Sequence, residues 1–306
     1  MASRSALFSR RQPGGVFQIF DIEQHPGDIF FVDSGHASAS DAVGAGQNPD
    51  RPFATIDYAI GQCTANRGDV IYVMPGHAET VSGAAGINCD VAGITIIGLG
   101  KGSARPTITM SAVASTIALA AASVHLKNFL IICNHDCTIV IDVNAADCII
   151  EGCEIRSRTA ATAREFVTAI DVNGGSANAC DRTRIVNCRI WSPTAGSNNG
   201  IELGEVADQV EISGCVIQGD YADAPIHNPT GKVLTLLRVS DCYLENTQTG
   251  DHALELVSAC TGALIRNLYK TDMTQATGAD PGSCFSYECY QDDVVDTSGI
   301  LTPVVT

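Results

Sequence analysis

The chain is short of charged residues, aromatic rings and long apolar runs. Charged residues make up 17% of its 306 residues and aromatic residues 6%, with a single tryptophan. No uninterrupted apolar run of about 18 residues occurs, which excludes a membrane-spanning helix. The opening, MASRSALFSRRQPGG, contains no apolar stretch, so we expect no secretory signal there.

Positive charge is the scarcer of the two signs. The chain has 34 acidic and 18 basic residues, a formal net charge of −16. An acidic protein repels phosphate groups, so we expect neither a nucleic-acid partner nor a membrane partner. The apolar share of 45% is large enough for a substantial buried core.

Cysteine is plentiful, but the spacings that bind zinc or form a disulfide scaffold are missing. The 13 cysteines are odd in number, the chain is long, and no Cys-x-x-Cys occurs. The close pair Cys133 and Cys137 has no second pair at zinc-finger spacing. We therefore expect no metal and no cofactor, and we interpret the thiols as small buried side chains.

A sequence repeat indicates the fold. Seven six-residue segments share one pattern. The first position is apolar or small, the third is aliphatic, the fifth is Gly, Asn or Asp, and the sixth is apolar, while the second and fourth positions vary. The fifth positions of these segments are Gly98, Asn128, Gly152, Asn187, Gly214, Asp241 and Asn267. Alternation of period two marks a strand with one buried face, and Gly, Asn or Asp tolerates a left-handed bend. A unit of 24 to 35 residues cannot bury its own apolar face, but stacked units can. The repeat therefore predicts an all-β chain wound into a parallel β-helix.

Stacking turns the residue after each bend into an interior column. The expected members are Leu99, Phe129, Cys153, Cys188, Cys215, Cys242 and Leu268. Four neighbouring cysteines could suggest a metal ladder or a redox chain. We interpret them instead as an inward stack of similar small side chains.

A second column carries the candidate chemistry. In five coils a polar residue stands in a short strand whose neighbours point inward, so it is expected on the outer face. These residues, which we call the acidic ladder, are Asp142, Asp171, Glu202, His227 and Glu255. Carboxylates at strand spacing repel one another, which can raise a pKa, create a general acid or bind a cation. A pair roughly 5 Å apart would suit a retaining glycosidase. The alternative, which we prefer, is an acidic ridge that keeps sheets apart, because a fold alone does not establish chemistry.

Residues 46–80, GQNPDRPFATIDYAIGQCTANRGDVIYVMPGHAET, resemble the opening of right-handed parallel β-helix proteins of the pectate-lyase-like class. The shared features are an Asn-Pro turn, Pro-Phe, a Thr-Ile helix start and Gly-Asp before the first strand. Thr55 can cap a short helix that seals the core, and Gly68-Asp69 can turn into a strand at 70–73. With the repeats, the resemblance extends to about residue 270. It implies a right-handed parallel β-helix with a short N-terminal capping helix and an extended N-terminal arm.

The resemblance implies three kinds of function: polysaccharide lyases, polygalacturonase-like hydrolases and phage virion proteins. The Asp-Asp of the hydrolases occurs here only at Asp292-Asp293, beyond the coils, and Gly-His is followed by Ala at both His36 and His77. A lyase would need Arg or Lys in the ladder, which offers only His227. We therefore lean against an enzyme and assign no catalytic residue. If the chain is an enzyme, it is a polysaccharide lyase or hydrolase that uses the acidic ladder.

The two ends of the chain point to assembly. We expect an N-terminal anchoring arm at residues 1–45, the β-helix at 46–283 and a C-terminal cap or interface tail at 284–306. The residues of the arm expected to bind a partner are Arg4, Phe8, Arg10, Arg11, Phe17 and Phe20. Such a segment is ordered only when a surface holds it.

These features predict a non-enzymatic structural protein of a phage virion, most of all a head-associated capsid decoration protein. Its expected partners are the major capsid protein or another virion protein and further copies of itself, a trimer being among the forms that fit. Its expected location is the capsid surface, and the host cytoplasm during assembly. The alternatives are a polysaccharide depolymerase and a glycan- or receptor-binding tail module.

Overall fold

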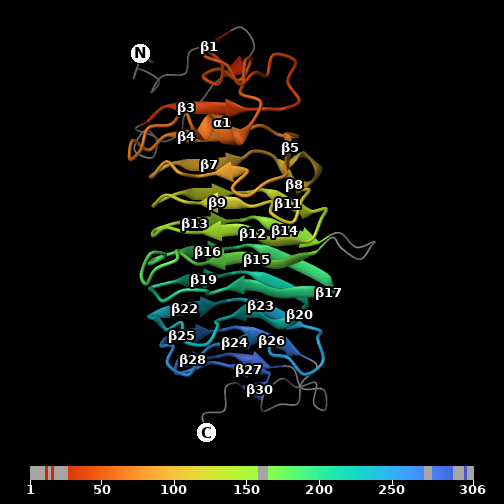
Figure 1. Cartoon of the computed structure of the whole chain (residues 1–306), viewed down its shortest axis with the longest axis vertical. Coiled ribbons are helices and arrows are strands. Elements are labelled where there is room, and N and C mark those ends of the chain that lie inside the picture. Colours follow the sequence, from red (N-terminus) through yellow and green to blue (C-terminus); the bar gives the residue numbers. More distant parts are fainter. Residues whose placement is uncertain are drawn as a thin grey trace.

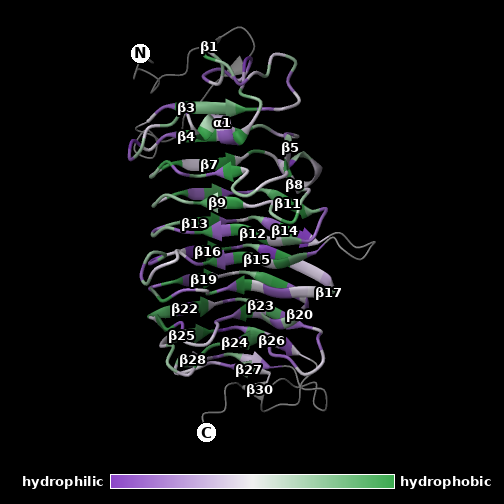
Figure 2. Ribbon diagram, viewed as in Figure 1, coloured by the Kyte–Doolittle hydropathy of each residue, from purple (hydrophilic) through white to green (hydrophobic). Residues whose placement is uncertain are grey.

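The computed structural model describes residues 27–157, 165–271 and 278–291, and the backbone alone at 11–12, 15–16 and 300–301. The chain winds into a parallel β-helix in which each coil lies on the coil before it, as Figure 1 shows. In Figure 2 hydrophobic residues recur in the strands of every coil, with hydrophilic residues between them. The predicted fold class is confirmed.

Three faces run along the stack, and every full coil contributes a strand to each. The first face contains β3 (Ile29–Val32), β4 (Val70–Val73), β7 (Thr95–Gly98), β10 (His125–Lys127), β13 (Ile149–Glu151), β16 (Arg184–Val186), β19 (Glu211–Ser213), β22 (Leu237–Ser240), β25 (Gly262–Ile265) and β28 (Phe285–Tyr287). The second face contains β5 (Ala78–Val81), β8 (Thr107–Met110), β11 (Leu130–Cys133), β14 (Glu154–Ser157), the start of β17 (Arg189–Glu202) and of β20 (Val216–His227), β23 (Tyr243–Asn246), β26 (Leu268–Thr271), β29 (Tyr290–Gln291) and the antiparallel β30 (Ile300–Leu301).

The third face carries the acidic ladder. It contains β6 (Ile87–Asn88), β9 (Ile117–Leu119), β12 (Cys137–Val143), β15 (Phe166–Val172), the ends of β17 and β20, β24 (Leu254–Glu255) and β27 (Ala279–Asp280). Two short pairs lie outside these faces: β18 (Ala207–Asp208) with β21 (Leu234–Thr235), and β1 (Arg11–Gln12) with β2 (Gly15–Val16). Because the strands of all three faces except β30 pair in parallel register, one position in a coil lies directly beside the same position in the next coil.

Stacked left-handed residues make the bend between the first and second faces. Asn128, Gly152, Asn187, Gly214 and Asp241 all have φ between 54° and 64°. Their backbone N–H groups bond to the next coil through the turn, as in the 2.8 Å bond from Asn187 to a carbonyl of β19. The sequence pattern predicted this bend, because Gly, Asn and Asp enter the left-handed region at the lowest cost.

The last repeat is shifted by one residue from its predicted register. Arg266, with φ 50°, takes the left-handed position in place of Asn267. Leu268 then pairs with Tyr243 and is 45% exposed, while Asn267 is 1% exposed and stands where Cys242 stands one coil earlier. The prediction that Leu268 faces inward is therefore wrong.

The first repeat also departs from the pattern. Gly98 ends β7 without a left-handed φ, and residues 99–106 leave the coil before β8 begins. The register of β8 with β11 places Pro106, not Leu99, beside Phe129. Leu99 is only half-buried, so its predicted place in the interior column is wrong.

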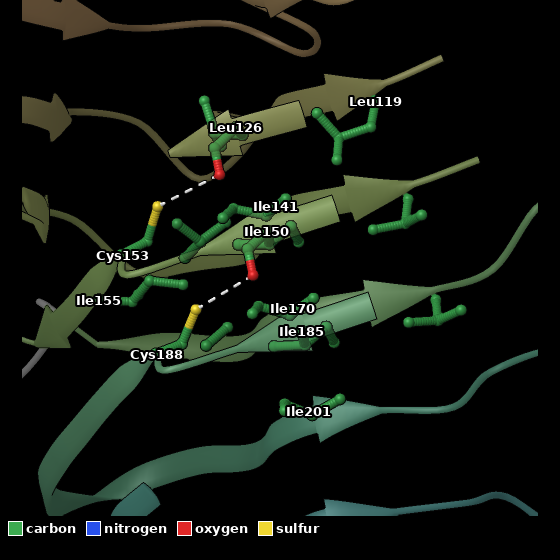
Figure 3. Packing of buried hydrophobic residues seen from close by; sticks show 14 of the residues in the cluster. Leu119, Leu126, Ile141, Ile150, Cys153, Ile155, Ile170, Ile185, Cys188 and Ile201 are labelled. Carbon is green, nitrogen blue, oxygen red and sulfur yellow. Dashed lines mark hydrogen bonds between the residues drawn. The ribbon is translucent and has the colours of Figure 1, made fainter. Parts of the chain in front are cut away.

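Four cysteines do form an interior column, as predicted. They are Cys153, Cys188, Cys215 and Cys242, each 2% exposed or less. Each thiol donates to a first-face carbonyl of the preceding coil, as Cys188 does to Ile150 at 3.6 Å in Figure 3. Burial raises the pKa of Cys153 to about 11. The column is therefore a packing feature whose thiols satisfy backbone carbonyls.

Replacing Cys188 with Ala should lower the free energy of unfolding by about 1 kcal/mol, the cost of a small cavity and one weak hydrogen bond. Urea unfolding of the two proteins measures the difference. Rapid labelling of the native cysteine column by a thiol reagent would show that the column is not interior.

The N-terminal end of the stack is closed by α1 (Ile56–Ile60), whose N-cap is Thr55 as predicted. His77, which is 1% exposed, connects the segments at this end through hydrogen bonds. Its Nδ1 accepts from the backbone N–H of Ser34 at 2.9 Å, and its Nε2 lies 3.1 Å from Glu79 Oε2. The same carboxylate oxygen accepts from the first N–H of the helix at 3.0 Å. The Gly-His sequence at this position therefore belongs to the cap.

Candidate functional site: the acidic ladder

The structure brings the five ladder residues into one column on the third face. Each member pairs in register with the next, and the column continues to a sixth member. In order it reads Asp142, Asp171, Glu202, His227, Glu255 and Asp280. The spacing between neighbouring strands is about 4.8 Å, so every carboxylate has a charged or titratable neighbour within reach.

Asp171 is the most enclosed member of the ladder. It is 5% exposed, and its Oδ1 has no hydrogen-bond partner. Gly204, in the turn after β17, approaches so closely that a Cβ there would lie 2.8 Å from Asp171 Oδ1. This turn therefore covers Asp171, which the sequence analysis placed on the outer face of its coil, and shields it from solvent.

Enclosure changes the acidity of the ladder. Burial, then the charge of Glu202, then that of Asp142 raise the pKa of Asp171 to about 7. Burial also raises the pKa of Asp142, opposed by a 2.9 Å hydrogen bond from Asn144 Nδ2. A carboxyl that holds a proton near pH 7 beside a second carboxyl is an arrangement that can serve acid–base chemistry.

Two neutral side chains complete the site around Glu202. Thr168 Oγ1 and Asn199 Nδ2 both donate to Glu202 Oε2, at 3.2 Å and 3.3 Å. They are 3% and 2% exposed, and Asn199 Oδ1 has no partner. One coil further on, His227 Nε2 lies 3.8 Å from Glu255 Oε2, and its Nδ1 is buried without a partner.

The sequence analysis missed Thr168 and Asn199, although a signal was present. Thr168 and Asn199 pair with each other in register, and each stands three residues before a ladder carboxylate. A second polar column parallel to the first could have been read from that spacing.

Further carboxylates precede the ladder along the same strands. Together with the carboxylates of the ladder they form what we call the acidic face; the added members are Asp136, Glu165, Asp220, Asp223 and Asp251. The backbone N–H of Glu165 donates to Asp136 Oδ1 at 3.4 Å. Burial raises the pKa of Asp251, with smaller contributions from Asp223 and Asp220.

The ion pairs of the β-helix lie elsewhere. Examples on the other faces and turns are Arg105–Glu154, Arg182–Asp147, Arg184–Glu211, Lys232–Glu205 and Lys270–Glu245, all at 3.2 Å or less. Within residues 27–157, 165–271 and 278–291, no carboxylate of the acidic face forms an ion pair with Lys or Arg. The acidic face is therefore left without compensating cations in this part of the chain.

Other features that could mark a site lie away from the ladder. A surface hollow of about 300 Å³ is lined by Arg266, Asn267, Leu268, Glu288 and Tyr290, near the C-terminal end of the stack. Among the described residues, no three His, Cys, Asp or Glu side chains are placed to hold a metal ion. The described helices include none with the length and apolar character needed to cross a membrane.

Most of the residues predicted to bind a partner lie outside the described part of the chain. Arg4, Phe8, Arg10, Phe17 and Phe20 lie outside the described residues, as does the Asp292-Asp293 pair. Arg11 is described by its backbone alone, in the antiparallel pairing of β1 with β2.

Comparisons with known proteins found two solved structures of low similarity. No protein-family model matches the chain, and no curated protein matches it in sequence. A rhamnogalacturonan lyase structure is similar at 13% identity and a TM-score of 0.45, over 81% of this chain and 75% of the lyase. A structure described as Geobacillus virus E2 ORF18 is similar at 9% identity and a TM-score of 0.41, over 85% of this chain. The chain spans half the length of that viral protein.

Proposed function

We propose that the chain is a non-enzymatic structural protein of a phage virion, a decoration protein of the head attached through its N-terminal arm. The observation that supports the non-enzymatic part of this proposal is the enclosure of Asp171, the ladder carboxyl whose pKa is raised most strongly. Asp171 is 5% exposed and is covered by the turn at Gly204. A catalytic acid must touch its substrate, and a polysaccharide needs an open cleft to do so.

The charges around the ladder support the same conclusion. Cleavage of a sugar chain by elimination develops negative charge, which an enzyme stabilises with nearby cations or N–H donors. In the described part of the chain, the acidic face has no ion pair with Lys or Arg. Its one contact with a titratable nitrogen among the described residues is His227 with Glu255 at 3.8 Å, and Thr168 and Asn199 already donate to Glu202. The site repels developing negative charge.

Deleting residues 1–26 tests the structural role. The deletion stops before Gly27, because the structure places the residues from Gly27 onward in the β-helix although the sequence analysis assigned them to the arm: Gly27 packs against Asp69, and β3 pairs with β4. We expect the shortened protein to stay soluble and to be absent from purified particles, because the arm provides the attachment. The full chain should be present in proportion to the shell protein, and not in the few copies of a tail component. Undiminished incorporation of the shortened protein would contradict the proposal.

One observation favours the alternative of a polysaccharide-cleaving enzyme: the pKa of Asp171 near 7 beside Glu202. We expect no new reducing or unsaturated sugar ends when the protein is incubated with host capsule, lipopolysaccharide or pectin, with or without calcium. Turnover that is present in the full chain and lost in Asp171→Asn would make the enzyme the correct assignment.

A further inference from the structure

Apolar side chains gather where the bend between the first and second faces reaches the C-terminal coils. From Asn128 onward, an outward side chain stands one residue before the bend residue of each coil and another stands two residues after it. Around Gly152 these two positions hold Glu151 and Glu154. In the last coils they are mostly apolar or aromatic, and together with a ring of β28 they form what we call the apolar corner. Its members are Tyr243, Ile265, Leu268, Phe285, Tyr287 and Tyr290.

The apolar corner is open to solvent. Phe285 is 68% exposed, Tyr287 51%, Leu268 45% and Tyr290 43%. Eight large apolar side chains are exposed among the described residues, and half of them are these four neighbours. Together they present roughly 400 Å² of mainly apolar surface, close to the apolar share of a standard interface of about 800 Å² per partner. A patch of this size marks a surface for a protein partner.

The charges around the corner are balanced, unlike those of the whole chain. Two copies of a chain with a net charge of −16 repel each other unless they meet at a neutral surface. Arg266 pairs with Asp241 at 2.7 Å and Lys270 with Glu245 at 2.6 Å. The acids and bases around the corner number three each: Asp241, Glu245 and Glu288, with Arg238, Arg266 and Lys270. The corner can therefore meet a second copy of itself without net repulsion at the contact.

A projecting ring and a hollow lie next to each other at this corner. Phe285 is the more exposed of the two rings on β28 and points to the same side as Tyr287. The residue after Tyr287 belongs to the wall of the hollow of about 300 Å³, which is lined by Arg266, Asn267, Leu268, Glu288 and Tyr290. Leu268 and Tyr290 give this hollow apolar walls that suit an aromatic side chain. Because ring and hollow share one surface, a two-fold axis places the ring of each copy opposite the hollow of the other.

We infer that two copies pair through their apolar corners about a two-fold axis, with Phe285 of each copy seated in the hollow of the other. Each copy uses the same surface, so the assembly closes at two chains. The contact lies in the last coils of the stack, where β25 and β28 are labelled in Figure 1. The inference goes beyond the virion role, since it concerns contact between copies and would stand if that role failed.

Sedimentation of the full chain in a reducing buffer tests the inference. We expect a dimer at about 100 µM chain. Phe285→Ala removes the ring, and Leu268→Asp places a charge in the wall of the hollow. Each variant should pair with itself at least about tenfold more weakly, and both should keep the circular dichroism of the unmodified chain because both side chains are exposed. A monomeric unmodified chain, or growth beyond two chains, would show that the inference is wrong.

Mixing the two variants provides the decisive measurement. Phe285→Ala keeps an intact hollow and Leu268→Asp keeps an intact ring, so a mixed dimer regains one of its two ring-in-hollow contacts. The mixed dimer should therefore be tighter than the dimer of either variant alone. If it were no tighter, the ring of one copy would not sit in the hollow of the other, and the inference would fail.

A control variant and the effect of salt complete the test. Val43→Ser with Val113→Ser removes two exposed apolar side chains away from the corner and should pair like the unmodified chain; equal weakening would overturn the inference. Raising salt from about 50 mM to about 500 mM should strengthen pairing or leave it unchanged, because salt screens the repulsion between two acidic chains. Dissociation by salt would indicate a contact between opposite charges and would also contradict the inference. These measurements are made without particles, so their result is independent of incorporation into a virion.

Discussion

Replacing Ile185 with Asp should prevent the chain from folding. Ile185 lies in β16 with 0% exposure, between Ile150 and Ile212 of the neighbouring coils. A carboxylate there would have no partner in an apolar interior, at a cost of at least about 4 kcal/mol. Because each coil supports the next, the damage would not stay local. We expect aggregated protein or a circular dichroism spectrum without β structure.

Val186→Asp is the matched control for this substitution. Val186 is the next residue of the same strand, but it is only half-buried and pairs with Glu151 and Ser213 on the outer surface. Its replacement should cost no more than about 1 kcal/mol, mainly from repulsion by Glu151. Normal folding of Ile185→Asp, or equal damage from both changes, would show that the interior and exterior of the first face have been wrongly assigned.

Replacing Asp171 with Asn should stabilise the protein above neutral pH. The pKa of Asp171 is about 7 in the folded chain, against an ordinary value of 3.8. The folded state therefore binds a proton that the unfolded state releases, and the free energy of unfolding falls as pH rises from about 4 to about 7. Because Asn does not ionise, the free energy of unfolding of the variant does not fall in this way as pH rises. The gain at about pH 8 should be roughly 2 to 4 kcal/mol, with little difference near pH 4.

Unfolding by urea at several pH values measures this effect, with Asp147→Asn as the control. Asp147 is on the surface, and its hydrogen bonds from Arg182 lower its pKa. Its replacement should change stability by less than about 1 kcal/mol, and in the opposite direction at neutral pH. If Asp171→Asn left the pH dependence unchanged, the carboxyl would be solvated, and the argument from its enclosure would no longer support the structural role.

The fold could be predicted because the repeat depends on local chemistry. The bends at Asn128, Gly152, Asn187, Gly214 and Asp241 use residue types that tolerate positive φ, and the alternation around them fixes which side faces inward. Each coil is encoded by its own short segment, so the fold can be predicted without knowing which distant segments pair.

The error in the last repeat arose because its local pattern fits two registers. Ala263-Leu-Ile-Arg-Asn-Leu268 can place either Arg266 or Asn267 at the bend. The structure uses Arg266, which lies one coil after Asp241 and donates two hydrogen bonds of 2.7 Å and 2.8 Å to its carboxylate. Arginine is not a residue type that signals a left-handed bend, so this choice depends on a neighbouring coil.

The sequence was enough to predict that the ladder residues line up in one column, but not how deeply each of them is buried. The alternation around Asp142, Asp171 and Glu202 was enough to place them in one column. The enclosure of Asp171 depends on how closely Gly204 approaches it, which is a contact between different coils. No periodicity in the sequence reports a contact of that kind.

The cysteines have a consequence for how the protein loses its structure. All 13 thiols are free, and all except Cys63 are buried. Native molecules are thus protected from oxidation, but an unfolded molecule exposes every thiol at once, with ordinary acidity and many wrong partners available. Where mispaired disulfides form in air before the coils refold, unfolding becomes irreversible. Without a reductant, durability is then set by the rate of the first opening and not by an equilibrium between folded and unfolded forms.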